Sequence, residues 1–202
     1  VPGERHWNRI GFENKYALNK QSVALDLTHP EARAALETLI AGADVLIENY
    51  SPRVMPQLGL GEDRLQELNP ALIYVTMPGY GRTGPDADRV AYGPMIDGHA
   101  GLSSLMGYEG SAGWKGGVAW PDPVAGIHAA AATVAALVAR RTDPGRRGLT
   151  VELSQLETTV HMVGDAVVAA QRAGRNPAPP GNRHPCFAPQ GVYRTAGDDR
   201  WL

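Results

Sequence analysis

The chain has 202 residues, of which 43% are hydrophobic and 20% charged, as is ordinary for a soluble globular protein. This length allows one domain with a real core, or one domain and part of a second. The net charge of −2 gives no electrostatic reason to expect nucleic acid or an anionic membrane as a partner. A single cysteine, Cys186, excludes a disulfide framework within the chain and indicates a reducing, cytoplasmic setting.

Neither a membrane span nor a complete chain is expected. A span needs about 20 consecutive apolar residues, and the longest weakly polar run, 124–139, is alanine-rich and contains a histidine. The sequence begins at Val1 and stops after Trp201 and Leu202, which resemble the middle of a strand. We therefore interpret the chain as a fragment, so that the lack of a visible signal peptide says little.

Short apolar runs alternate with helical patterns in the first third of the chain. The runs predict strands at 22–27, 44–48 and 71–77. Helices are expected at 30–40, 52–58 and 62–68. This order is typical of the βαβ units that build a parallel sheet, so the sequence predicts an α/β fold.

The remaining chain adds loops, a long helix and a further strand. Glycine-rich loops with short helical pieces occupy 79–117, and a long helix is expected at 122–141. A strand at 149–153 then leads directly into a helix at 155–173. Three prolines mark the next stretch, 174–180, as a linker.

The segment 79–84 matches the GxGxxG pattern and follows a predicted strand, which superficially indicates a dinucleotide site. Pro78 precedes the first glycine, and Pro85 with the polar residues 86–89 follows in place of a helix. A dinucleotide site needs a helix N-terminus aimed at the pyrophosphate, and none is predicted here. We therefore favour a structural glycine loop.

Ser154 and Glu157 lie where the last predicted strand passes into a helix. Their spacing is that of a capping box, and from spacing alone we favour this interpretation. The alternative is a functional carboxylate at the mouth of an α/β sheet, where ligands bind in such folds. His161 and Asp165 are expected on the same helix face as Glu157, which suits an acid–base relay but is more often a solvated surface.

The histidines offer no other chemistry. The six of them show no spacing typical of metal ligands, so no metal site is predicted. We interpret His128, within an alanine-rich helix, and His99, among the glycines, as packed and hydrogen-bonded side chains.

Several segments, taken in order, resemble the family III CoA transferases, also called the carnitine dehydratase and bile-acid-inducible operon family. They are 19–26, 43–52, 58–60, 69–70, 78–85, 148–157, 191–193 and 197–201. The resemblance covers nearly the whole chain and about the middle half of a full-length member. It implies that 1–173 form part of a large, Rossmann-like CoA-binding domain with a parallel sheet. Residues 174–202 would then be a linker and the first strand of a small domain.

The resemblance also implies a site and a reaction. The family's nucleophile is an aspartate at the position of Glu157, and Leu25, Asn49 and Tyr50 match positions that line the CoA site. The nucleophile would attack an acyl-CoA thioester, form a mixed anhydride and pass CoA to an incoming carboxylic acid. Members act as two interlocked subunits, and no cofactor is implied beyond CoA itself as substrate.

Two departures from the family pattern matter for this chemistry. Glutamate at 157 adds a methylene to the side chain, and misplacement of a reacting group by about 1 Å can cost ~100-fold in rate. Gln57 stands where another member would place an arginine near the CoA phosphates.

Two other functions remain open. A 2-methylacyl-CoA racemase of the same family would need a histidine where this chain has Tyr92, and an aspartate where it has Glu157. A non-catalytic subunit that pairs with an active homologue in a heteromer would also lack the aspartate at 157.

Overall fold

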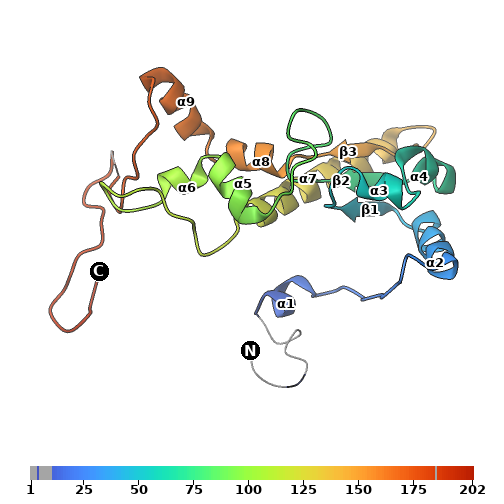
Figure 1. Cartoon of the computed structure of the whole chain (residues 1–202), viewed down its shortest axis with the longest axis horizontal. Helices are drawn as coiled ribbons and strands as arrows, with labels where there is room; N and C mark the ends of the chain where they lie inside the picture. Colours follow the sequence, from blue (N-terminus) through green and yellow to red (C-terminus); the bar gives the residue numbers. More distant parts are fainter. Residues whose placement is uncertain (1–3, 5–10, 185) are drawn as a thin grey trace. The chain divides into compact units, whose positions relative to one another are not determined.

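The fold is taken from a computed structural model that describes residues 4, 11–184 and 186–202 (Figure 1). These residues form two compact units, Val1–Thr38 and Leu39–Leu202. The first unit contains α1 (Gly11–Tyr16) and the start of α2 (Pro30–Ala41), which begins at the proline that the sequence indicated. The strand predicted at 22–27 is wrong, because these residues pair with no strand in the described chain.

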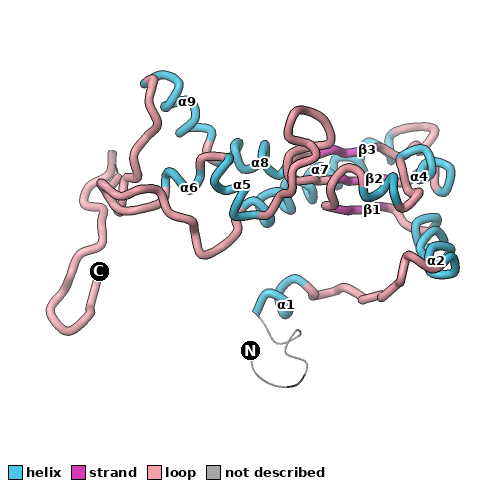
Figure 2. The backbone as a smooth tube through the Cα atoms, viewed as in Figure 1, coloured by secondary structure: helices cyan, strands magenta, loops and turns pink. Residues whose placement is uncertain are grey.

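Three parallel strands form the sheet of the second unit. They are β1 (Val45–Glu48), β2 (Ile73–Thr76) and β3 (Thr150–Glu152), in the order β1-β2-β3 (Figure 2). The register places Glu48 opposite Thr76, and Thr76 opposite Glu152, so these residues form one row at the carboxyl end of the sheet. The predicted α/β fold with a parallel sheet is confirmed.

One face of the sheet is covered by the long helix α7 (Pro121–Thr142), which lies within two residues of its predicted bounds. Ile73 and Val75 of β2 are fully buried against Ala129 and Ala136 of this helix. Alanine lets the helix approach the sheet closely, and burial of each large aliphatic side chain contributes about 1.5–3 kcal/mol. This contact is the core that positions the strand ends.

By length and composition, α7 is the one helix in the described chain that could cross a membrane. Such a match is weak evidence, because helices that pack in the core of soluble proteins pass the same test. In this unit α7 contacts β2, β3, α5 (Gly93–His99) and α8 (Gln155–Met162). The expectation that the chain has no membrane span stays a prediction.

Three further short helices complete the unit: α3 (Val54–Gln57), α4 (Glu62–Leu68) and α6 (Leu102–Leu105), of which α6 packs against α5. The bounds of α4 agree with the sequence, whereas α3 is shorter than expected. It ends at Gln57 with Leu58 as its C-cap, and Gly59 follows with a φ of 71° that no continuing helix allows.

The helix predicted at 155–173 is two helices, α8 and α9 (Gly164–Ala173). Val163 separates them with φ −107° and ψ 20°, outside the helical region. Its side chain is buried, and the glycine that follows is a poor helix former. The helix is therefore interrupted at this position rather than continued. Near the end of the chain, a single antiparallel bridge joins Arg194 to Trp201 in place of the expected strand. The predicted boundary between the two domains after residue 173 stays a prediction.

Candidate functional site

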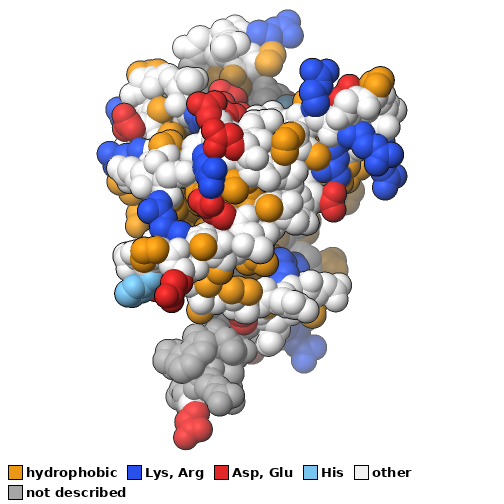
Figure 3. All heavy atoms as spheres, turned by 90° about the vertical axis from the view of Figure 1, so that its right-hand side faces the viewer, with side chains coloured by type: hydrophobic (Ala, Val, Ile, Leu, Met, Phe, Trp, Pro, Cys, Tyr) orange, Lys and Arg blue, Asp and Glu red, His pale blue; other side chains and the backbone are white. Residues whose placement is uncertain are grey.

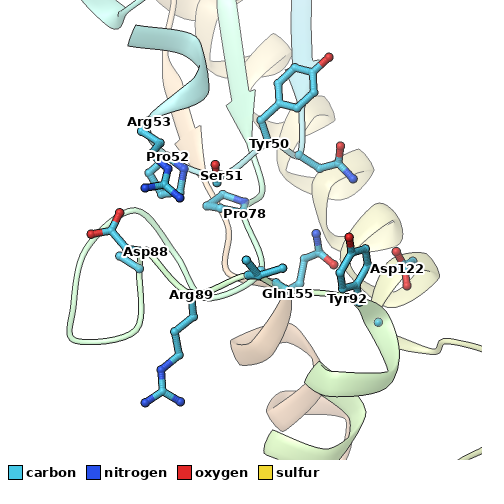
Figure 4. Close-up of a pocket in the computed structure, with 16 residues that line it drawn as sticks. Tyr50, Ser51, Pro52, Arg53, Pro78, Asp88, Arg89, Tyr92, Asp122 and Gln155 are labelled. Atoms are coloured by element: carbon cyan, nitrogen blue, oxygen red, sulfur yellow. The ribbon is translucent and has the colours of Figure 1, made fainter. Parts of the chain in front are cut away.

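A cavity of about 400 Å³ lies at the carboxyl ends of the strands (Figure 4). Its walls come from segments 49–53 after β1 and 78–79 after β2, from the loop 87–93, and from the first turns of α7 and α8. Parallel sheets bind ligands at this edge because the loops after the strands converge there. The position of the cavity therefore marks it as the candidate binding site.

Two of the three residues that the family resemblance assigns to CoA line this cavity, namely Asn49 and Tyr50. Both follow directly after β1, and the Tyr50 side chain is 52% exposed. The third, Leu25, belongs to the first compact unit, so it is not placed relative to the cavity. Gln57 is exposed in α3 and is not among the lining residues.

The charges in the cavity are unevenly paired. Arg89 forms an ion pair with Asp86 at 2.7 Å, whereas Arg53 forms no ion pair with any residue that the structure describes. Asp88 and Asp122 supply negative charge elsewhere in the lining. In Figure 4, Arg53 lies near Pro52 and Ser51, while Asp122 lies with Tyr92 and Gln155 at another part of the cavity.

The glycine loop 79–84 is joined to the junction between β3 and α8. The carbonyl of Gly79 accepts from the amide of Leu156 at 2.9 Å, and that of Pro78 accepts from the amide of Gln155 at 3.2 Å. Gly79 must be glycine, because a Cβ there would lie 2.1 Å from Cβ of Ala91. No helix begins between Gly84 and α5, so the predicted structural loop is confirmed.

Arg82 joins the same loop to the sheet. Its amide donates to Oε1 of Glu152 at 2.8 Å, and its guanidinium donates to Oε2 of Glu62 at 3.0 Å. The hydrogen bond from Arg82, with a smaller one from Thr150, lowers the pKa of Glu62. The sequence did not predict this network, because its partners are separated by up to 70 positions.

Glu157 occupies the first turn of α8 and is exposed. Its amide donates to Oγ of Ser154 at 3.3 Å, which confirms the first half of the predicted capping box. The returning bond from its carboxylate is not formed in this part of the chain, so the side chain is not held as a cap. Glu157 does not itself line the cavity, but Gln155, two residues earlier, does.

The expectation that Glu157, His161 and Asp165 share one helix face is wrong, and with it the alternative of an acid–base relay loses its geometric basis. Asp165 belongs to α9, beyond the break at Val163, so the three do not share one continuous helix face. The ring of His161 contacts that of His128 edge-on instead, with 5.6 Å between the ring centroids.

The hydrogen bonds expected of His128 and His99 are confirmed, but only His128 is also partly buried, whereas His99 is exposed. Nδ1 of His128 lies 2.8 Å from the carbonyl oxygen of Val124, one turn earlier in α7. Nδ1 of His99 lies 2.7 Å from the Tyr80 hydroxyl, at the end of α5.

Asp97 is a buried carboxylate that sequence reasoning missed. It is 0% exposed, and neither of its carboxylate oxygens has a hydrogen-bond partner among the described residues. Burial and the neighbouring Asp122 raise its pKa, and Lys115 opposes this shift. An aspartate in a glycine-rich segment has no periodicity that reveals burial, so the sequence offers no signal for it.

The described residues contain no group of three or more His, Cys, Asp or Glu side chains that could hold a metal ion. Cys186 is free and exposed. On the face drawn in Figure 3, acidic and basic side chains are interspersed rather than gathered by sign.

Comparison with known proteins identifies the fold and its relatives. A family model described as CoA-transferase family III matches residues 5–202. The chain is 35% identical over its whole length to an acyl-CoA transferase from Fusarium pseudograminearum, of which it covers 45%. It is 36% identical, over 88% of its length, to a succinate–glutarate CoA-transferase from Agrobacterium fabrum, of which it covers 44%.

The solved structures agree. A CAIB/BAIF family protein from Brucella suis superposes with a TM-score of 0.82 and 30% identity, over 90% of this chain and 47% of that one. The chain thus spans about half the length of the relatives it matches.

Proposed function

Because the chain belongs to CoA-transferase family III, we propose that the full-length protein moves CoA from an acyl-CoA thioester to a carboxylic acid. The observation that carries the proposal is the cavity at the strand ends, with Asn49 and Tyr50 in its wall. These are residues for which the family resemblance implies CoA contacts, and their position agrees with the ligand-binding edge of a parallel sheet.

In this proposal Glu157 is the nucleophile. Three observations support it: the side chain is exposed, it does not cap its own helix, and it follows the junction to which the glycine loop is bound. The first turn of a helix also directs backbone amides toward a negative charge.

The first chemical step forms an anhydride. A carboxylate oxygen of Glu157 bonds to the thioester carbonyl carbon, the carbon–sulfur bond breaks, and CoA leaves as a thiolate. Thiolate is a good leaving group because the pKa of a thiol is only about 8.5. The donor acyl group is then joined to Glu157 as a mixed anhydride.

CoA must next change partner. The thiolate attacks the glutamyl carbonyl and releases the donor acid, which leaves CoA on Glu157 as a thioester. The acceptor carboxylate then runs the same two steps in reverse, so CoA departs on the acceptor and the free carboxylate of Glu157 returns. No proton or electron is gained or lost over the cycle. Water must be kept out because anhydrides hydrolyse readily.

We further propose that one of the acids is a dicarboxylate. A relative is named for succinate and glutarate, and the cavity contains the cationic side chain of Arg53 without an ion-pair partner in the described chain. A guanidinium matches a carboxylate with two parallel hydrogen bonds.

The test uses the full-length protein and a panel of acyl-CoA donors and acids. Hydroxylamine should trap the acyl-enzyme as a hydroxamate, and mass spectrometry should locate it on Glu157. E157Q should abolish transfer while CoA binding survives. E157D should lower the rate by about 100-fold if the cavity is fitted to the longer side chain. An active enzyme whose Glu157 remains unmodified would refute the assignment.

A second candidate is a non-catalytic subunit that binds CoA beside an active homologue. The observation that favours it is that Glu157 does not line the cavity. The two candidates differ in whether the protein, purified alone, transfers CoA. Its mass in solution would show whether it forms a homodimer or requires another chain. Deuterium exchange at the α-carbon of an acyl-CoA without any acceptor acid would instead identify a racemase.

A further inference from the structure

Glu48, the last residue of β1, accepts two hydrogen bonds with its two carboxylate oxygens. Oε2 accepts from the backbone amide of Tyr50 at 2.7 Å, and Oε1 accepts from the hydroxyl of Tyr74 at 2.9 Å. The amide bond is short for an N–H···O contact, as expected for a charged acceptor, and the hydroxyl bond lies within the ordinary range for O–H···O. The side chain of Glu48 therefore connects the segment after β1 to the neighbouring strand β2.

The Tyr74 end of this connection is rigid. Tyr74 lies in the central strand and is only 6% exposed. Burial first, and then the hydrogen bond to Glu48, raise its pKa, so the hydroxyl keeps its proton and remains a donor. The register places Glu48 opposite Thr76, two residues beyond Tyr74 on the same strand, which brings the carboxylate within reach of the phenol.

At the other end of the connection, the segment that contains Tyr50 forms part of the cavity wall. Asn49 and Tyr50 line the cavity, but the Tyr50 side chain is half exposed, so packing alone does not fix this segment. Glu48 is not among the lining residues, and both of its oxygens are already occupied. Its geometry suits holding the backbone rather than contacting a ligand.

We propose that Glu48 is a positioning residue that sets the backbone of Asn49 and Tyr50 for CoA, an inference that rests on the proposed function. A wall segment fixed before binding loses less conformational freedom when the ligand arrives, which strengthens binding without a direct contact. The other outer strand, β3, ends in the same way, because Glu152 accepts a hydrogen bond from the backbone amide of Arg82. Each outer strand thus ends in a glutamate that holds the loop next to the site.

The test compares four variants of the full-length protein: E48A, E48Q, Y74F and D44A. E48A removes both bonds and should raise KM for acyl-CoA about five- to tenfold, with kcat changed less than about twofold. E48Q should restore KM to within about twofold, because its amide oxygen accepts from Tyr50 while its amide nitrogen donates to the Tyr74 oxygen. Y74F should fall between wild type and E48A.

The control D44A removes an acidic side chain just before the other end of β1, where Asp44 pairs with Arg140 at 2.6 Å. D44A should leave KM for acyl-CoA unchanged, even if D44A lowers the thermal unfolding temperature as much as E48A does. The inference is overturned if E48A keeps the wild-type KM, if D44A raises KM equally, or if E48Q is as impaired as E48A. The last result would mean that charge, not position, matters.

Hydrogen exchange separates failure of this inference from failure of the proposed function. In protein without ligand, E48A should speed exchange in the peptide that contains the Tyr50 amide, whereas E48Q and D44A should not. A wild-type protein that neither binds nor transfers CoA would refute the function, even with that amide protected. Unchanged exchange in E48A would refute the role of Glu48, whatever reaction the protein catalyses.

Discussion

The amide of Arg82 donates to Oε1 of Glu152 across 70 positions of sequence, at 2.8 Å. This bond connects the glycine loop to the last residue of β3. Two residues later, Ser154 is the N-cap of α8, the helix whose first turn contains Glu157. Neighbouring bonds from 155 and 156 to the carbonyls of 78 and 79 bind the same two segments together. The loop and the candidate nucleophile are therefore parts of one hydrogen-bonded unit.

Loss of the Glu152 carboxylate should loosen this unit. We expect E152A to lower the free energy of unfolding by about 0.5 kcal/mol, because one hydrogen bond to an exposed charged acceptor is lost. The rate of CoA transfer should fall more than KM for acyl-CoA rises, since Glu157 depends on this junction. Urea unfolding and steady-state kinetics would measure both, with E67A, in an exposed pair with Arg64, as the control. A larger effect on KM than on kcat would contradict this prediction.

The glycine at 79 should be irreplaceable, whereas the one at 98 should not. A Cβ at 79 would lie 2.1 Å from Cβ of Ala91, so G79A must push the loop 87–93 outward and cost about 1–3 kcal/mol. A Cβ at 98, within α5, meets nothing within 4 Å. G98A should therefore stabilise the protein by about 0.5–1 kcal/mol, since alanine favours the helix. Urea unfolding of both variants tests the pair, and equal effects would contradict the geometry.

The sequence predicted the fold wherever local signals and packing agreed. The helices α4 and α7 lie at or within two residues of their expected bounds, because proline, charge and apolar spacing mark their ends. The three strands of the sheet are shorter than their apolar runs, since pairing with a neighbour, not hydrophobicity, decides where a strand ends. The break at Val163 goes with burial of that side chain, and the run 22–27 is mostly exposed and finds no partner strand in the described chain; no local pattern contains either fact.

The site was predictable in part for the same reason. Segments that follow the ends of parallel strands lie at one edge of the sheet. Asn49, Tyr50 and the glycine loop follow such ends, so we could expect them to lie close together. The burial of Asp97 has no local signal, and the bonds Glu48–Tyr74 and Arg82–Glu152 join residues that are 26 and 70 positions apart. These features follow from register and burial, which appear only once the chain is folded.

Removal of the Asp97 charge should stabilise the protein at neutral pH. Burial raises the pKa of this carboxyl, so the folded state holds its proton more tightly than the unfolded state does. The stability contributed by that proton is complete below the unfolded pKa of about 3.9 and is lost as pH rises through the folded pKa. D97N should thus be more stable than wild type by about 1 kcal/mol at pH 7 and equal to it near pH 4.

Urea unfolding of the two proteins between pH 4 and pH 8 measures this difference, with D63N as the control on an exposed helix end. A D97N variant that is less stable than wild type at pH 7 would show that the carboxylate has a charged partner in the full-length protein.

Arg53 should select between acids. If its guanidinium pairs with the second carboxylate of a dicarboxylic acid, R53A should raise KM for succinate or glutarate about tenfold, because a charge-assisted contact is lost. KM for butyrate or pentanoate, which lack that group, should change by less than about twofold. If Arg53 contacts a CoA phosphate instead, R53A would weaken the binding of CoA and of every acyl-CoA alike, and KM would change equally for all acids.

The control R89A removes a guanidinium that is already paired with Asp86, so its effect on KM should differ less between the acids. Steady-state kinetics with paired mono- and dicarboxylic acids of equal length decides between these outcomes, because only the additional charge differs within each pair.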